Sequence, residues 1–298
     1  MKWALVLSGG GARGLAHIGV LRELERRGSP MPVFIAGASM GAIIGAMYSM
    51  GWDASRMEAY ARGFKLGDFM ENPSFRLPDF ALSRLVQAGA ALRAMLRGPG
   101  LDSGARVLAE FKRLFGDIRI EDMPVPFACT ATDLVDGHTV VFDSGPLAEA
   151  LRSSMSFPGV FTPVRLGDML LVDGGILDNM PCDAAKARGF RHILASNVSP
   201  LEDIDPSSLK NGMDVVARCF NAATKSAQER INAMASLTVT SFDDSATFSF
   251  EHVDALIGLG ERSAGLAAAE LGRFFARGPS RLASLVGKLL GWKRSRVR

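Results

Sequence analysis

The feature that most constrains this chain of 298 residues is a run without a single charged side chain, which extends over residues 28–52. Its sequence is GSPMPVFIAGASMGAIIGAMYSMGW, and about 20 apolar residues are enough to cross a bilayer as a helix. The glycines in its middle, however, fit a sharp turn better than a continuous span. A strand of about four residues and a helix of about twelve account for the run, because the central strand and helix units of a parallel sheet are apolar throughout. We therefore expect a buried strand, a turn at Ser39 and a helix, with no membrane span.

The same alternation of short apolar strands and amphipathic helices continues along the chain. KWALVL predicts the first strand, and GLAHIGVLRELERRG predicts a helix that ends at Gly28. Further strands are expected at VPFACTAT, DMLLV and HILASNV, with a hairpin turn at Asp136-Gly137. These patterns predict an α/β fold of three layers, in which a mostly parallel central sheet is covered by helices on both faces.

Helical patterns dominate residues 53–115, where the strand signal fades. We interpret this segment as a helical cap or insertion within one large domain that extends over residues 1–270. Its helices offer apolar faces that would form or cover a binding site, and that would equally serve as plain core. The residues on these faces are Leu82, Leu85, Val86 and Leu92.

The charges of the chain are distributed unevenly. The net charge is +3, but residues 271–298 carry eight cations and no acid, whereas the first 270 residues carry 26 cations and 31 acids. Apolar residues recur at helical spacing in this basic end, as in an amphipathic helix that lies on an anionic membrane surface. The alternative is a packed terminal helix with a solvated tail. No stacking or groove-reading motif accompanies the charge, so nucleic acid is not an expected partner. The apolar residues are Phe274, Phe275, Leu282, Leu285, Val286, Leu289 and Trp292.

The start of the chain and its cysteines suggest where the protein is found. The five apolar residues that follow Lys2 are too few for the apolar segment of a signal peptide. Cys129, Cys182 and Cys219 are odd in number and far apart, which predicts buried thiols rather than disulfides or a zinc site. We expect a cytoplasmic protein, with contact to the inner face of the membrane through the basic end.

The pentapeptide GASMG, residues 37–41, has the G-x-S-x-G pattern of a nucleophile elbow. Gly37 and Gly41 would let two backbones pass closely on either side of a serine that is held in a strained conformation. The hydroxyl of Ser39 would then be exposed where the strand ends and the next helix begins. Ordinary tight turns are also rich in glycine and serine, so the pentapeptide alone leaves a structural turn as the alternative.

A glycine-rich stretch, SGGGARG at residues 8–14, follows the first predicted strand and opens the first helix. Gly9, Gly11 and Gly14 also satisfy G-x-G-x-x-G, which makes a dinucleotide site an alternative. Such a site needs an acidic residue about twenty positions later to hold the ribose, and the chain has none between Glu25 and Asp53.

Consecutive backbone N–H groups at a helix start would serve a hydrolase differently. They would stabilise the oxyanion that forms when Ser39 attacks an ester carbonyl. Arg13 would add positive charge close by, and it would also fit the role of an arginine that bonds carbonyls at the helix start.

A serine nucleophile needs a base, which is usually a histidine. His17 is expected to pack on the first helix, His138 lies by the hairpin turn, and His192 begins a strand at the wrong edge of the sheet. No local motif recommends His252, but its position leaves it open. The other candidate is Asp173 in LLVDGG, at the carboxyl end of a strand and therefore at the edge where Ser39 is expected.

Asp173 could take the proton of Ser39 directly if burial raised its basicity, and the small residues Gly174 and Gly175 would let the two groups approach. A plain Asp-Gly turn is the alternative.

At this point the chain resembles a known family. GGGARG, GASMG and DGG, in that order, look like the motifs of the patatin-like phospholipases, and so do ALRSSMSFPGVFTPV at residues 150–164 and ATDLVDGHTVVF at residues 131–142. The resemblance implies an α/β/α fold related to the catalytic domain of cytosolic phospholipase A2, here over residues 1–270.

The resemblance also implies a chemistry. It makes Ser39 the nucleophile and Asp173 the base of a Ser-Asp dyad, with Gly10, Gly11 and Arg13 around the oxyanion. It assigns Asn179 and Pro181 to shaping the loop after the dyad aspartate. It further implies no metal and no cofactor, and the hydrolysis of lipid acyl esters through an acyl-serine intermediate.

Overall fold

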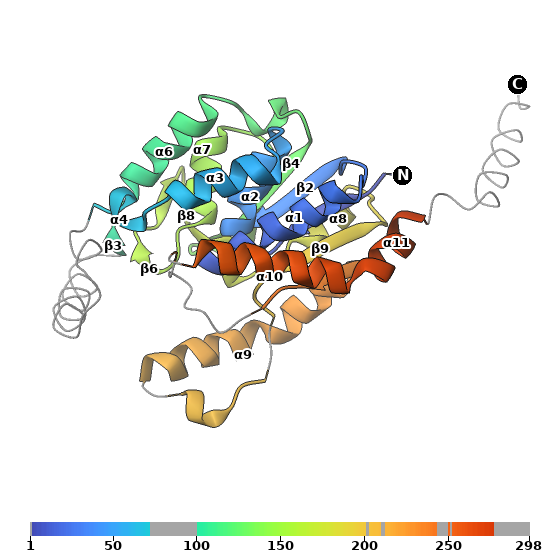
Figure 1. Ribbon diagram of the computed structural model, residues 1–298. Helices are drawn as coiled ribbons and strands as arrows, with labels where there is room; N and C mark the ends of the chain where they lie inside the picture. The colour runs from blue at the N-terminus through green and yellow to red at the C-terminus, as the bar shows by residue number, and fades with distance from the viewer. Residues whose placement is uncertain are drawn as a thin grey trace, which may run out of the picture.

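The computed structural model describes residues 2–71, 100–200, 203–209, 212–242, 250 and 252–276. An eight-stranded sheet in the order β10-β9-β1-β2-β4-β8-β7, with β5 also paired to β4, forms the centre (Figure 1). Its strands are β1 (Ala4–Leu7), β2 (Phe34–Ala38), β4 (Phe127–Asp133), β5 (Thr139–Phe142), β7 (Val164–Leu166), β8 (Met169–Asp173), β9 (Ile193–Asn197) and β10 (Leu237–Thr240). A second sheet pairs β3 (Gly100–Asp102) with β6 (Gly159–Phe161).

The helices of the described part are α1 (Ala16–Arg26), α2 (Met40–Ser49), α3 (Ala54–Gly63), α4 (Leu66–Phe69), α6 (Ala105–Phe115), α7 (Leu147–Ser154), α8 (Cys182–Ala187), α9 (Gly212–Asn232), α10 (Val253–Leu266) and α11 (Ala268–Ala276). Gly28, with φ of +64°, follows the end of α1, as its position in the sequence predicts.

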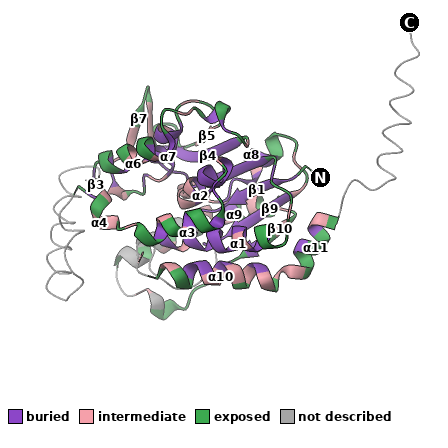
Figure 2. Ribbon diagram, turned by 45° about the horizontal axis from the view of Figure 1, so that its top comes forward, coloured by how far each residue is buried: buried purple, intermediate pink, exposed green. Residues whose placement is uncertain are grey.

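Alternate residues of each central strand face two separate cores, which makes the fold three-layered. Leu5 and Leu7 of β1 belong to the larger core, which also contains residues of α1, α2, α10 and α11. Ala4 and Val6 of the same strand face a smaller core with α8. Figure 2 shows the buried strands between the two helical layers. The predicted α/β/α architecture with a mostly parallel sheet is therefore confirmed.

The uncharged run forms a strand and a helix, as expected. β2 covers Phe34–Ala38, α2 covers Met40–Ser49, and β2 lies between the parallel strands β1 and β4. Within the described ranges, no helix is both long and apolar enough to span a bilayer. The hairpin turn at Asp136-Gly137 is also present, because β4 and β5 pair antiparallel around it.

The direction of β8 differs from what a parallel sheet would require. β8 runs antiparallel to β4, with Asp173 opposite Ala131, whereas β2 runs parallel to β4, with Ala38 opposite Thr130. β5 occupies the other side of β4 at Thr130 and Ala131, so β2 and β8 share one side of β4. Asp173 and Ser39 lie close together, as expected. The reason differs from the prediction, because the ends of two strands of opposite direction face each other, rather than two parallel strands ending at one edge of the sheet.

Part of the predicted cap joins the main core. Met57 of α3 and Phe111 of α6 are both buried in the larger core. Leu82, Leu85, Val86 and Leu92, on which the sequence-based prediction of apolar faces rests, lie outside the described residues.

The basic end is described only as far as residue 276. Within α11, Phe274 and Phe275 stack edge to face against Trp3, with ring centroids 6.0 and 5.3 Å away. Phe274 and Phe275 therefore belong to a helix that packs on the domain, which is the alternative to a helix that lies on a membrane. Residues 277–298, which carry most of the basic charge, lie outside the described part.

Candidate active site

Ser39 has the backbone of a nucleophile elbow. Its φ of 52° and ψ of −123° place it between the end of β2 and the start of α2, and it is the one described residue other than glycine with a positive φ. A Cβ on Gly37 would lie 2.5 Å from the carbonyl carbon of Gly41, and one on Gly41 would overlap the carbonyl oxygen of Leu7. Both glycines are therefore required by close backbone contacts, as the motif predicts.

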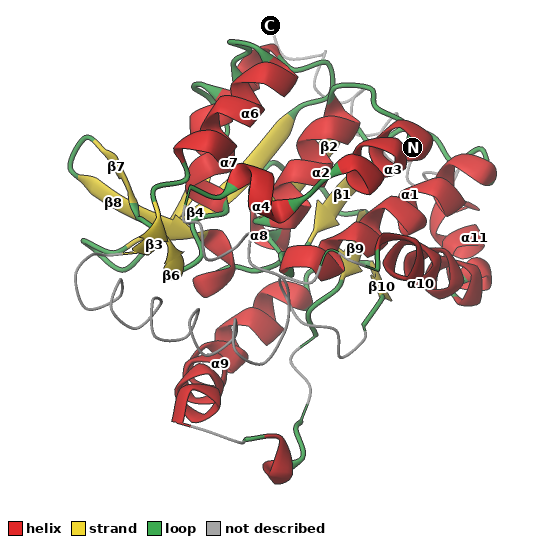
Figure 3. Cartoon of the chain, turned by 60° about the vertical axis from the view of Figure 1, so that its left-hand side comes forward, coloured by secondary structure: helices red, strands yellow, loops and turns green. Residues whose placement is uncertain are grey.

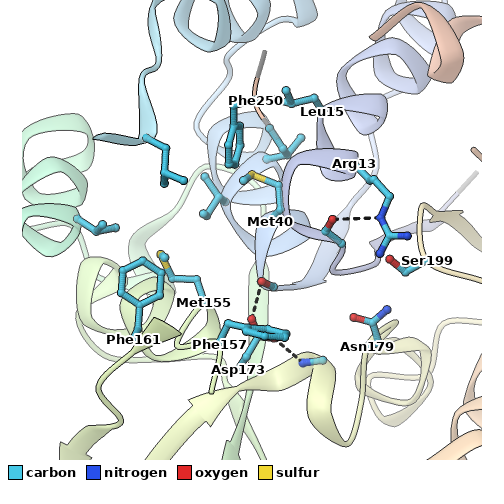
Figure 4. A pocket seen from close by; sticks show the side chains of 18 of the residues that line it. Arg13, Leu15, Met40, Met155, Phe157, Phe161, Asp173, Asn179, Ser199 and Phe250 are labelled. Atoms are coloured by element: carbon cyan, nitrogen blue, oxygen red, sulfur yellow. Dashed lines mark hydrogen bonds between the residues drawn. The ribbon is translucent and has the colours of Figure 1, made fainter. Parts of the chain in front are cut away.

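Asp173 lies directly beside Ser39. The Ser39 hydroxyl donates a hydrogen bond of 2.6 Å to Asp173 Oδ2, and the Gly175 N–H donates one of 2.8 Å to Oδ1 (Figure 4). Asp173 is only 4% exposed, and this burial raises its pKa to about 6, although the two hydrogen bonds oppose the rise. A carboxyl group with this pKa is ionised at neutral pH and basic enough to take a proton.

The two glycines after Asp173 allow the turn to pack closely. A Cβ on Gly174 would overlap the carbonyl oxygen of Thr130, and one on Gly175 would lie 2.7 Å from Asn179 Oδ1. Asn179 also joins this turn to the glycine-rich loop, because the backbone carbonyl of Asn179 accepts a hydrogen bond of 3.0 Å from the Gly9 N–H. Pro181 follows at the position that precedes the first residue of α8.

The glycine-rich loop packs against the elbow. A Cβ on Gly9 would lie 3.2 Å from the Cβ of Ser39, and one on Gly14 would overlap the side chain of Met40. Gly10 and Gly11 line the same cavity as Ser39, and Gly11 has a φ of 57° that favours glycine. The loop that the sequence suggested as an oxyanion site is therefore adjacent to the serine.

Arg13 contacts a carbonyl of the glycine-rich loop and also lines the cavity. Its Nε lies 3.5 Å from the carbonyl oxygen of Gly10, and its guanidinium lies 5.5 Å from the centre of the Phe242 ring. The side chain also lines the cavity, on the same side of Asp173 as Asn179 and Ser199 (Figure 4).

His17 has a structural role that the sequence did not reveal. The ring is completely buried, with Nε2 2.8 Å from the Ser8 carbonyl oxygen and Nδ1 2.8 Å from Ser196 Oγ. Because a carbonyl only accepts, Nε2 carries the proton and Nδ1 accepts from the hydroxyl. Burial lowers the pKa of this histidine to about 4, so the ring is neutral. It fixes the residue that precedes Gly9, and a lone histidine in a helical pattern gave no signal of this.

The other histidines stay away from the dyad. His252 is exposed at the start of α10, His138 is exposed at the hairpin turn, and neither lines the cavity. Among the described residues, no group of three or more His, Cys, Asp or Glu is arranged to hold a metal ion.

The cavity above Ser39 has a volume of about 900 Å³ and two unlike sides. On one side of Asp173 lie Arg13, Asn179 and Ser199, and on the other lie Met155 and Phe161 (Figure 4). The apolar side extends between α2, α3 and α6, and its walls include Ile43, Met47, Met57, Phe64, Phe69 and Phe111. A cavity of this size with mostly apolar walls has the character of a small-molecule binding site.

Comparison with known proteins identifies the family. Residues 5–186 match the model of the patatin-like phospholipases. The chain belongs to this family. An uncharacterized NTE family protein of Mycobacterium tuberculosis is 35% identical over 226 residues, which cover 74% of this chain and 56% of that protein. The lysophospholipase NTE1 of Eremothecium gossypii is 31% identical over 224 residues, or 74% of this chain and 14% of that protein.

These relatives are longer than this patatin-like chain. The chain spans about half the length of the Mycobacterium protein. Among solved structures, VipD from Legionella pneumophila has a similar fold, with a TM-score of 0.52 and 15% identity. That similarity covers 89% of this chain and 66% of VipD, and at this level of identity it supports the fold alone.

Proposed function

We propose that this patatin-like protein is a serine hydrolase that cleaves the acyl esters of lipids, with Ser39 as nucleophile and Asp173 as general base. The observation that carries this proposal is the 2.6 Å hydrogen bond between a serine at a strained elbow and a buried carboxylate whose pKa is about 6. Membership of the patatin-like phospholipases, and a relative named lysophospholipase NTE1, support a lipid substrate.

The reaction has two steps with a covalent intermediate. Ser39 Oγ attacks the ester carbonyl carbon while its proton passes to Asp173, and the alcohol then leaves with that proton. Water attacks the resulting acyl-serine while its proton passes to Asp173. The fatty acid leaves, the proton returns to Ser39 and the carboxylate is restored.

The negative charge that develops on the carbonyl oxygen needs donors that are already in place. Gly10 and Gly11 lie at the start of a 3₁₀ turn (Gly11–Leu15) and line the same cavity as Ser39. The first N–H groups of a helical turn have no partner within that turn, so they are free to serve as donors. We assign the oxyanion hole to these two residues, with the positive charge of Arg13 in support. The acyl chain would occupy the apolar side of the cavity.

The test is hydrolysis of p-nitrophenyl esters by the wild type, Ser39→Ala, Asp173→Asn and His252→Ala, together with labelling by a fluorophosphonate probe and intact-mass detection. We expect a label on Ser39, and loss of turnover in the Ser39 and Asp173 variants only. Loss of turnover in His252→Ala would favour a Ser-His-acid esterase. A wild type that neither turns over nor takes the label would refute the proposal.

We also propose that residues 1–270 form the catalytic domain, against which α11 packs, and that the remainder of the basic segment 271–298 contacts the inner face of the membrane. The eight cations of this segment support an attraction to anionic lipid. Deletion of residues 279–298 should then weaken binding to anionic vesicles and leave the hydrolysis of short soluble esters unchanged. Unchanged vesicle binding would contradict this role.

A further inference from the structure

Among the residues that the structure describes, the most exposed part of the cavity lining is apolar. Of the described residues that line the cavity, four are exposed, and none of them is polar. They are Leu134, Phe157, Pro158 and Ile204, and the exposed fractions of the three larger ones are 52%, 41% and 39%. A pocket that receives water-soluble molecules has no need of such a rim, because each of these side chains is held in water at a cost.

Two neighbouring side chains extend this rim. Val135 is 66% exposed and Leu166 is 43% exposed. The turn that carries Leu134 and Val135 lies against the β7–β8 hairpin, since the Leu134 N–H donates to the Leu170 carbonyl at 2.8 Å. Leu166 lies at the end of the same hairpin, which projects from the body of the molecule (Figure 3). The turn with Leu134 and Val135 and the hairpin with Leu166 are therefore adjacent, and they place exposed apolar side chains beside the cavity.

The rim is also directly connected to the dyad. The backbone N–H of Asp173 donates to the Ser156 carbonyl at 3.0 Å, and Phe157 is the next residue. Phe157 and Leu134 line the same cavity as Ser39, so an acyl chain that enters over them would reach the serine within that cavity.

Large exposed apolar patches mark surfaces that bind something. A protein partner seated over this opening would close the path to Ser39. A lipid surface seated there would instead deliver the substrate, because its acyl chains would face the apolar entrance.

We propose that these six residues, Leu134, Val135, Phe157, Pro158, Leu166 and Ile204, which we call the mouth surface, insert into the boundary between head groups and acyl chains of a lipid bilayer. This inference rests on the proposed function and adds the route by which substrate arrives. The mouth surface differs from the basic segment in its chemistry, because the exposed charges beside it are four acids and one cation, Asp136, Asp168, Asp203, Asp205 and Arg165. Binding through it should therefore draw on apolar insertion and not require anionic lipid.

The test compares two double variants on neutral phosphatidylcholine vesicles at low and high salt. Val135→Ser with Leu166→Ser alters the mouth surface at two residues that do not line the cavity. Met31→Ser with Val33→Ser is the matched control. These residues are also exposed apolar side chains, at 47% and 38%, but they lie just before the start of β2, and Ser39 follows the opposite end of that strand. The loss of two inserted apolar side chains should reduce vesicle partitioning by about tenfold or more.

We expect the first double variant to lose vesicle binding, and to lose hydrolysis of vesicle lipid by a similar factor relative to hydrolysis of a short soluble ester. The control should behave like the wild type. Normal vesicle binding by the first variant, or equal losses in both variants, would overturn the proposal. A change in oligomeric state, seen by size-exclusion chromatography of the first variant alone, would assign the mouth surface to contact between two copies instead.

A second measurement does not depend on losing an interaction. In a Val135→Trp variant, lipids with brominated acyl chains should quench the fluorescence of the new indole, and absence of quenching in vesicle-bound protein would contradict insertion. The two proposals fail separately. A wild type that binds neutral vesicles through the mouth surface but never labels at Ser39 refutes the hydrolase, whereas a protein that labels and hydrolyses but whose variants bind normally refutes the docking.

Discussion

Ser39 and Asp173 meet because two strands of opposite direction end face to face on one side of β4. Ala38, the last residue of β2, pairs with Thr130, and Asp173, the last residue of β8, pairs with the next residue, Ala131. The 2.6 Å contact between the two side chains is thus held by the hydrogen-bond register of the sheet rather than by a long loop. A site positioned by paired strands is held more precisely than a site carried by loops.

The first prediction concerns the pH dependence of activity. Asp173 must be ionised to act as a base, and burial raises its pKa to about 6, so kcat/KM should rise with pH through about 6 and then level off. At pH 5 it should be about tenfold below the plateau. The measurement is kcat/KM for a short soluble ester between pH 4.5 and 8. A profile that is flat through this range would be inconsistent with Asp173 as the base.

The second prediction concerns the stability cost of the same carboxylate. The folded protein binds the proton of Asp173 more tightly than the unfolded chain does, so folding stability falls as pH rises from about 4 to 6, and the cost is complete above pH 6. The shift corresponds to about 3 kcal/mol. Asp173→Asn, which we expect to be inactive, should therefore unfold at a higher temperature than the wild type at pH 7.5, with the difference shrinking toward pH 4. An Asn variant that is less stable at pH 7.5 would contradict this.

Arg13 is the subject of the third prediction. Arg13→Met keeps most of the aliphatic stem near Phe242 but removes the positive charge beside the proposed oxyanion hole. We expect kcat for a soluble ester to fall by about a hundredfold with KM nearly unchanged, since the charge acts on the transition state. Arg13→Lys, which keeps the charge, should recover part of the rate. An effect on KM alone would instead assign Arg13 to substrate binding.

The inner strands of the central sheet and the motifs were predictable from the sequence because each carries its own local signal, whereas the edge strands β7 and β10 and the short pair β3 and β6 were not predicted. The elbow at Ser39 is one example, since Gly37 and Gly41, within a single pentapeptide, indicate that the backbone is closely packed there. The direction of β8 carries no such signal. A short apolar strand reads the same whether it runs parallel or antiparallel, so only the register on β4 shows how Asp173 reaches the serine.

Long-range packing was equally hidden from the sequence. Gly19 in α1 and Gly260 in α10 lie 241 residues apart, and neither belongs to a motif. In the structure a Cβ on Gly19 would overlap the Ile257 carbonyl, and one on Gly260 would overlap the Ala16 carbonyl. The two helices therefore cross in backbone contact, and α10 covers the helix that follows the glycine-rich loop (Figure 1).

This crossing leads to the fourth prediction. Gly260→Ala should separate α10 from α1 and lower the free energy of unfolding by about 1–3 kcal/mol, as other overpacked contacts do. Gly265→Ala is the control within the same helix, because nothing lies within 4 Å of a Cβ at that position. The control should be neutral or slightly stabilising, since alanine favours helix. Chemical denaturation of both variants provides the measurement, and equal stabilities would contradict the crossing.

The last prediction concerns His17, which is neutral in the folded protein because burial lowers its pKa from 6.5 to about 4. The unfolded chain binds this proton more tightly, so the contribution of His17 to stability is complete above pH 6.5 and is lost as pH falls toward 4, by about 3 kcal/mol in all. Asp173 changes stability in the opposite direction over much of this window, so the wild type conceals both effects.

A comparison of variants separates the two contributions. His17→Gln can still donate to the Ser8 carbonyl but does not titrate, so its stability relative to the wild type should improve steadily from pH 6.5 to pH 4. His17→Leu leaves the Ser8 carbonyl and the Ser196 hydroxyl without this buried partner, and should cost about 2–4 kcal/mol at neutral pH. If the ring also positions the glycine-rich loop, His17→Gln should retain more of kcat than His17→Leu at a temperature where both are folded. Equal kcat values would limit His17 to a role in stability.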